Sequence, residues 1–228
     1  MKKALLALVA TLGLTFNMSA QNPGEDNGFG LKLHVAIPGS EYGNEGKTSN
    51  SLYTTESEYS GLLFGIDLDN RWYVWHNDMF GVAVNAHWMD FSFGAGEIET
   101  TAKSKASLGS LSVKSSSSVD VTNMEVGLLG VGPMFTFYLG HDMAVDGYYN
   151  IVPTAMCMFE ENPKDDEDDY FFWGAGFTHN VGAAFRWKFL QTGLEYRLGE
   201  IELEEADNDD MEYDASANSL RVFFGFKF

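Results

Sequence analysis

Apolar and polar residues alternate with a period of two along much of this chain, which is the pattern of strands with two different faces. The clearest example is the final segment, from Ser219 to Phe228. One of its faces is wholly apolar and the other carries its charges: Leu220, Val222, Phe224, Phe226 and Phe228 against Arg221, Phe223, Gly225 and Lys227. A chain built from such segments is expected to fold as a sheet that separates two environments.

The same alternation recurs in earlier segments and predicts about eight strands of a length that crosses a membrane when tilted. Their apolar faces centre on residues 29–37, 62–74, 80–88, 177–187 and 194–198. The predicted polar faces are Lys32, His34 and Ala36; Asp67, Asp69, Arg71 and Tyr73; Asn85 and His87; Asp146, Tyr148, Asn150 and Thr154; Thr178, Asn180 and Arg186; Gln191, Glu195 and Arg197. The segment from Met124 to Leu139 is apolar on both parities, and Gly132–Pro133 is expected to mark a bulge in it.

The predicted connections alternate between short and long. Three are short, around 76–78, 140–142 and 188–189, and four are long and polar, around 38–58, 94–122, 160–170 and 202–216. The serine run Ser115–Ser118 predicts a flexible loop. Long loops at one rim and short turns at the other are typical of an even-stranded outer-membrane barrel, with both termini on the short-turn side.

The first twenty residues predict a secretory signal peptide, so residues 21–228 form the single domain. Lys2 and Lys3 supply the positive region, residues 4–16 the apolar region, and Ser19 and Ala20 the small residues before a cleavage expected at Gln21. An uncleaved anchor helix is the alternative. No later segment has the long apolar run of a membrane helix.

Composition excludes several classes of function. A net charge of -19 argues against nucleic-acid binding, which needs clustered Lys and Arg. The lone cysteine, Cys157, excludes an internal disulfide and argues against a cysteine-rich zinc site. We expect Cys157 to pack as a small apolar residue on the lipid side.

Which face is buried depends on whether the barrel is soluble or in a membrane. Aromatic residues near predicted strand ends favour the membrane, where they form interfacial girdles: Trp72, Trp75, Trp88, Tyr138, Phe172, Trp173, Trp187 and Phe228. The polar faces then line the lumen. There Lys32, Arg71, Arg186, Arg197, Arg221 and Lys227 are expected to pair with Asp67, Asp69, Asp146 and Glu195, because buried charge survives only when paired.

The signal segment, the alternating strands and the ending Leu220–Phe228 together resemble the small outer-membrane β-barrel family of the OmpA/OmpX-like type. The resemblance implies an all-β fold, an eight-stranded antiparallel up-and-down transmembrane barrel in the outer membrane. It also implies a monomer, with lipid and lipopolysaccharide as partners, and recognition of the strand ending at Phe228 by the barrel assembly machinery. The interior of such a barrel is just filled by side chains, so we expect a plugged lumen. A narrow proton or ion path is the alternative.

No catalytic, cofactor-binding or metal site is predicted, and the chain is not expected to be an enzyme. His87 is followed by Asp90 and Ser92, but strand parity places His87 in the lumen and Asp90 on the opposite face. His76 and His141 fall in turns. His179 falls on the predicted lipid face.

Two loops are strongly acidic and hold 15 of the 33 acidic residues: Glu160, Glu161, Asp165, Asp166, Glu167, Asp168 and Asp169, and Glu202, Glu204, Glu205, Asp207, Asp209, Asp210, Glu212 and Asp214. Clustered carboxylates suit calcium, but the order of an EF-hand loop is absent, and a solvated, repulsive surface is favoured. These loops are the expected place for an external ligand.

The leading hypothesis is therefore an outer-membrane barrel with a structural or surface-interaction role. A soluble, lipocalin-like periplasmic barrel that binds an apolar ligand is the second hypothesis. An outer-membrane barrel enzyme acting on lipid or peptide is the third.

Overall fold

A computed structural model describes residues 28–43, 47–49, 53–104, 114–140, 142–161, 169–206 and 208–228. The predicted signal segment 1–20 lies outside these residues. None of the described residues belongs to a helix that could cross a membrane. The strands are β1 (Gly28–Pro38), β2 (Lys47–Ser49), β3 (Tyr53–His76), β4 (Phe80–Ser104), β5 (Lys114–Gly140), β6 (Met143–Glu160), β7 (Tyr170–Trp187), β8 (Leu190–Glu205), β9 (Asn208–Ser216) and β10 (Ser219–Lys227).

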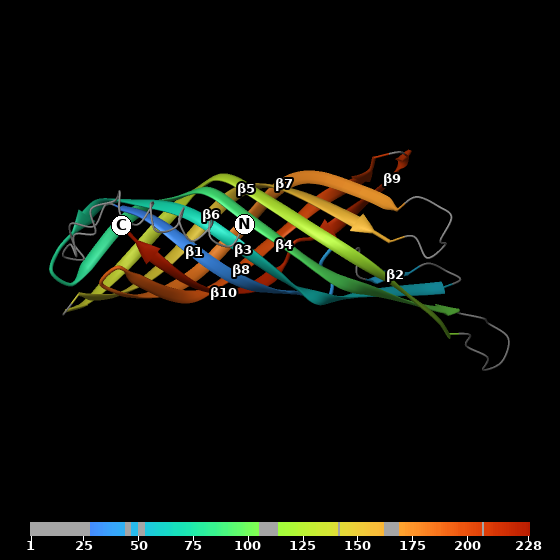
Figure 1. Ribbon diagram of the computed structural model, residues 1–228, viewed down its shortest axis with the longest axis horizontal. Coiled ribbons are helices and arrows are strands. Elements are labelled where there is room, and N and C mark those ends of the chain that lie inside the picture. Colours follow the sequence, from blue (N-terminus) through green and yellow to red (C-terminus); the bar gives the residue numbers. More distant parts are fainter. Residues whose placement is uncertain are drawn as a thin grey trace, which may run out of the picture.

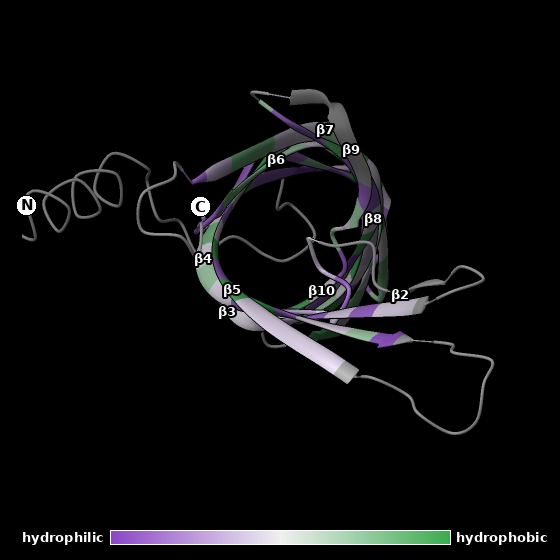
Figure 2. Ribbon diagram, turned by 90° about the vertical axis from the view of Figure 1, so that its right-hand side faces the viewer, coloured by the Kyte–Doolittle hydropathy of each residue, from purple (hydrophilic) through white to green (hydrophobic). Residues whose placement is uncertain are grey.

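The sheet closes on itself into a barrel (Figures 1 and 2). β1 pairs antiparallel with β10 on one side and with β3 on the other, and the remaining neighbours follow the order β10-β8-β7-β6-β5-β4-β3. The two short strands extend this wall, β2 against β3 and β9 against β8. The wall therefore has the eight antiparallel strands that the alternation predicted.

The three short turns lie where the sequence predicted them, at the left-hand end in Figure 1. They join β3 to β4, β5 to β6 and β7 to β8. Positive φ angles at Gly140, Asp142 and Lys188 mark two of these turns as tight. β10 ends at this same rim beside the start of β1, since Lys227 pairs with Gly30.

The prediction of four long loops is partly wrong. Three strands continue far beyond the band of outward-facing apolar side chains (the apolar layer). β3, β4 and β5 have 24, 25 and 27 residues, whereas a tilted crossing needs about 10. The run Ser115–Ser118 is not a loop but part of β5, paired with Glu99–Ala102 of β4. A strand outside the membrane needs no apolar face, because the neighbouring strand supplies its backbone hydrogen bonds and water solvates its side chains. The polar composition of Ser115–Ser118 therefore led to the wrong prediction of a loop.

The other long connections differ in the same way. β8 continues to Glu205 and β9 begins at Asn208, so most of the predicted loop 202–216 is a hairpin. The segment 38–58 likewise contains β2 and the start of β3. Only around 160–170 do the flanking strands end where a loop was predicted, at Glu160 and Tyr170.

The wall is apolar outside and polar inside. Phe64, Phe135 and Phe177 are each at least 60% exposed on the outer surface. The residues predicted on the polar faces of β1, β7 and β8 are buried, including Arg186 and Arg197. This arrangement is the reverse of a lipocalin-like barrel, whose apolar face lines the interior. Two aromatic residues assigned to the outer girdles, Tyr138 and Phe172, instead face inward.

A β-bulge in β4 overturns one predicted facing. Leu68 pairs with Met89 and Asp69 with His87, so Trp88 is an extra residue. Trp88 and Met89 both face outward, and Asp90 is therefore buried inside the barrel. Simple parity placed Asp90 on the lipid face because it cannot register an extra residue.

β5 has a matching irregularity. Its register against β6 shifts between Gly127 and Val131, where Leu129 has a φ of 55°. The predicted bulge is thus a few residues earlier than Gly132–Pro133.

The outer end of the barrel has an apolar interior. Buried residues from seven strands and from the β9–β10 connection pack there with the connection after β1: Ala36, Tyr42, Tyr59, Leu63, Val121, Met156, Met158, Phe172, Ile201, Leu203, Ala215 and Ala217. Gly43 holds a positive φ of 66° and its N–H donates to the Ser216 carbonyl at 2.8 Å. The Tyr59 N–H of β3 donates to the Ser40 carbonyl at 2.6 Å, so the segment 39–43 is held between β3 and the end of β9.

Candidate functional site

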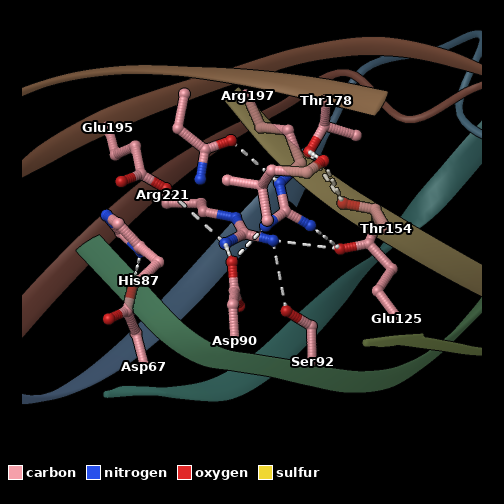
Figure 3. Close-up of polar contacts among 12 residues, drawn as sticks. Asp67, His87, Asp90, Ser92, Glu125, Thr154, Thr178, Glu195, Arg197 and Arg221 are labelled. Atoms are coloured by element: carbon pink, nitrogen blue, oxygen red, sulfur yellow. Dashed lines mark hydrogen bonds and ion pairs between the residues drawn. The ribbon is translucent and has the colours of Figure 1, made fainter. Parts of the chain in front are cut away.

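Two arginines and two carboxylates form the centre of the lumen (Figure 3). Arg221 of β10 donates to Asp90 at 2.6 Å and to Glu125 at 3.0 Å. Arg197 of β8 donates to Glu125 at 2.7 Å and also to Asp90. All four side chains are at most 2% exposed. Because Asp90 and Glu125 lie on β4 and β5, these ion pairs tie opposite walls of the barrel together.

A second group lies beside Arg221. Lys32 Nζ is 2.7 Å from Asp69 and 3.7 Å from Asp67, and Asp67 is 2.6 Å from His87 Nδ1. Glu195 accepts a hydrogen bond from the Tyr148 hydroxyl at 3.0 Å. His87 also contacts Asn150 at 2.9 Å.

A third group lies nearer the turns and centres on Asp146. It accepts hydrogen bonds from Arg186 Nε at 2.5 Å, Arg71 Nη1 at 2.9 Å and the Thr136 hydroxyl at 2.6 Å. Charged and hydrogen-bonding side chains thus line the lumen at three successive levels, and each charged residue named in these groups has an opposite charge nearby.

Most of the ion pairs that the sequence predicted in the lumen are present. Lys32, Arg71, Arg186, Arg197 and Arg221 pair with carboxylates, and Lys227 is buried at the turn end of the lumen. Asp90 and Glu125 were missed as partners. The bulge hid the facing of Asp90, and Glu125 lies in the segment whose parity was ambiguous. One sequence feature indicated that Glu125 faces the lumen, namely its charge within an apolar run.

The residues of the weak catalytic pattern lie on one side of the wall, but their contacts are not the ones that the pattern suggests. His87, Asp90 and Ser92 all face the lumen. Ser92, however, contacts His34 Nε2 at 3.0 Å rather than His87. Ser92 also accepts a hydrogen bond from Arg221 at 3.2 Å, and both Ser92 and His34 are buried. A serine next to a histidine can form a nucleophile–base pair, but this pair lies within the closed wall and not at the outer rim.

Asp67, His87 and Glu195 place possible metal ligands within 4.8 Å of one another. Cations of the protein already occupy this neighbourhood. Lys32 lies 3.7 Å from Asp67, and Arg221 lies 3.5 Å from Glu195. A metal ion there would be repelled by both, so the geometry favours an ion-pair network.

The remaining predicted residues lie on the outside. His179 contacts the Tyr149 hydroxyl at 2.6 Å on the outer wall. Cys157 is half-buried on the outer side of β6. His76 is exposed at the end of β3, and His141 lies outside the described residues.

Part of the acidic surface can be placed. Glu202 and Glu204 are exposed on β8, and Glu202 pairs with the exposed Asp214 of β9. Residues 162–168 and 207 lie outside the described part of the chain, so Asp165, Asp166, Glu167, Asp168 and Asp207 stay predictions. The exposed carboxylates described on β8 and β9 thus place charges of the same sign next to each other.

No protein-family model matches the sequence, and no curated protein matches it. Solved structures of outer-membrane proteins are similar in fold. Ail, the attachment invasion locus protein of Yersinia pestis, in complex with the heparin analogue sucrose octasulfate, is 11% identical over 89% of this chain and 99% of its own, with a TM-score of 0.44. OprG from Pseudomonas aeruginosa is 12% identical over 89% and 96%, with a TM-score of 0.44. The outer membrane protease OmpT from Escherichia coli is 8% identical over 88% and 91%, with a TM-score of 0.43. At these values no residue's role is carried over to this chain.

Proposed function

We propose that this protein is exported through a cleaved signal peptide and acts in the outer membrane as a closed barrel with a structural or surface-interaction role. The observation that carries the proposal is the crossed ion pairs of Arg197 and Arg221 with Asp90 and Glu125, which span the lumen. Moving these buried side chains aside would leave charges unpaired in a low-dielectric interior, which is costly. The apolar residues at the outer end and the segment 39–43 add a second closure.

Because a closed lumen leaves no path for solutes, we expect the role of this protein to lie on its outer surface. The extended ends of β3, β4 and β5 project beyond the apolar layer and offer a surface to an external ligand. Lipid and lipopolysaccharide surround the wall below, and the strand ending at Phe228 is the expected contact of the barrel assembly machinery. We do not propose an enzymatic role, because Ser92 and His34 are both buried inside the barrel, where a substrate would have to reach them.

Sugar uptake into liposomes tests the closed lumen. We expect vesicles that contain the purified full chain to swell no faster in a pentose solution than protein-free vesicles. We expect a variant carrying Arg197→Ala and Arg221→Ala, if it folds, to admit the sugar. Uptake or stepwise conductance by the unaltered protein would contradict the proposal, whatever the variant does.

Three further measurements test location and orientation. The mature chain in the outer-membrane fraction should begin at Gln21, and its gel mobility should shift on heating. Trypsin added to intact cells should cut near Lys103, which is exposed on the projecting part of β4. An uncut chain, or a chain in the soluble fraction, would contradict the outward orientation of the long strands.

A further inference from the structure

A polar pair lies on the outer wall where the chain otherwise presents apolar side chains. Tyr149 of β6 and His179 of β7 stack with ring centroids 5.9 Å apart, and the Tyr149 hydroxyl is 2.6 Å from His179 Nδ1. His179 lies roughly midway along β7 between two exposed tryptophans, Trp173 and Trp187. If these tryptophans mark the two interfaces, the pair lies near the middle of the apolar layer.

The pair does not satisfy its own hydrogen-bonding capacity. A neutral imidazole carries one N–H, and a tyrosine hydroxyl carries one O–H. If Tyr149 donates to Nδ1, the N–H at Nε2 of His179 is left over. If Nδ1 donates instead, the hydroxyl hydrogen of Tyr149 is left over. In the part of the chain that the structure describes, no third side chain takes up this donor.

Lipid tails cannot accept a hydrogen bond, so a donor at this depth requires a partner protein. We propose that the outer wall formed by β5, β6 and β7 is a dimer interface, at which the Tyr149–His179 pair of one copy meets the same pair of a second copy. The sequence alone favoured a monomer, and this pair is the reason to expect a dimer.

Hydrogen-bond complementarity favours a second copy over another partner. In the first arrangement each pair offers one surplus donor, the Nε2 N–H, and one surplus acceptor, the Tyr149 oxygen. Both copies share one orientation in the membrane, so their twofold axis runs along the membrane normal and keeps each residue at its depth. His179 of one copy can then donate to Tyr149 of the other, twice, and neither donor is left over.

The shape of the same wall supports a self-complementary contact. At the irregularity in β5, Leu129 has its φ of 55° and a side chain that is 67% exposed. Beside it is a shallow outer groove of about 400 Å³, lined mainly by Val126, Leu128, Pro153, Ala155, Ala175 and Phe177. Small residues let two membrane proteins approach closely. Around a twofold axis, Leu129 of each copy would enter the groove of the other.

Cysteine cross-linking of the full chain in lipid vesicles locates the contact. In a Cys157→Ser background, we compare Ile151→Cys with Leu33→Cys. Ile151 pairs with His179, whereas Leu33 faces lipid on β1, opposite β6 in the ring of strands. We expect a covalent dimer from Ile151→Cys and none above background from Leu33→Cys. Equal cross-linking at both positions would overturn the proposal.

Removing the polar atoms tests their part in the contact. His179→Leu and Tyr149→Phe should each leave the heat-modifiable barrel intact, because they replace lipid-facing polar groups. Each hydrogen bond in a membrane changes association by a factor of about three to ten, so loss of both should weaken the dimer about tenfold or more. Thr192→Val, which alters a lipid-facing hydroxyl on β8, is the matched control and should leave association unchanged. Association that is unaffected by His179→Leu, or an unaltered protein that is monomeric at all protein-to-lipid ratios, would overturn the proposal.

Discussion

Arg197 on β8 and Asp90 on β4 form an ion pair across the barrel interior, although 107 residues separate them in the sequence. The two strands lie on opposite sides of the ring. Asp90 also accepts a hydrogen bond from Arg221 at 2.6 Å. One carboxylate therefore contacts two guanidinium groups from neighbouring strands, β8 and β10, and connects them to the far wall.

The facing of Asp90 can be tested by replacing it with an apolar residue. Asp90→Leu should destabilise the barrel by about 3 kcal/mol, because Arg197 and Arg221 lose a shared buried partner. Urea unfolding in detergent micelles, followed by the loss of heat-modifiable protein, measures the change. Met89→Leu, one residue earlier and facing lipid, should change stability by less than about 1 kcal/mol. A neutral or stabilising Asp90→Leu would mean that Asp90 faces the lipid, as simple parity suggests.

Tyr42 lies in the connection after β1, and its hydroxyl donates a hydrogen bond to Glu125 in the lumen at 2.8 Å. Tyr42→Phe should lower the free energy of unfolding by about 2 kcal/mol, because the hydrogen bond is to a charged group and is buried. Tyr196→Phe, at an exposed position on the outer wall of β8, is the control and should be close to neutral. The same unfolding assay compares the two. Equal effects would show that the contact of Tyr42 with Glu125 does not stabilise the barrel.

Gly65 lies where no side chain fits. A β-carbon there would overlap the His34 ring and the backbone oxygen of Phe91. Gly65→Ala should therefore reduce the yield of folded barrel and its unfolding free energy, by roughly 1–3 kcal/mol. Gly147→Ala is the matched control, because nothing lies within 4 Å of a β-carbon at that position. A folded yield of Gly65→Ala that equals that of Gly147→Ala would contradict the close packing of β1, β3 and β4.

Phe228 adds one backbone hydrogen bond beside the ladder in which β10 pairs with β1. The Phe228 N–H donates to the Phe29 carbonyl at 2.8 Å, and β10 joins β8 to β1. Deletion of Phe228 should lower the amount of barrel in the outer membrane several-fold and leave unassembled chain in the periplasm. Quantitative immunoblots of fractionated cells measure this, with Phe228→Trp as a control that keeps an aromatic end. Normal outer-membrane levels of the deletion variant would remove the proposed role of this residue in assembly.

The extent of successful prediction differed along the chain. Alternation correctly assigned the facing of residues such as Lys32, Asp146 and Arg197, because one side of each strand meets apolar surroundings and the other does not. It failed at Ser115–Ser118, where both faces are polar and composition resembles a loop. It also failed at Asp90, because one extra residue at Trp88 reverses the parity of everything that follows.

The sequence by itself determined that the chain is all-β, that it closes through a C-terminal amphipathic strand and that charges occupy the inner face. These properties are local, since they depend on period-two patterning and on the identity of each residue. Only the tertiary structure decided which charges meet, how far β3, β4 and β5 extend, and that Tyr149 and His179 share a place on the outer wall. Those relationships depend on the register between strands and on bulges. Both arise from pairing with neighbouring strands, so the sequence of a single strand does not predict them.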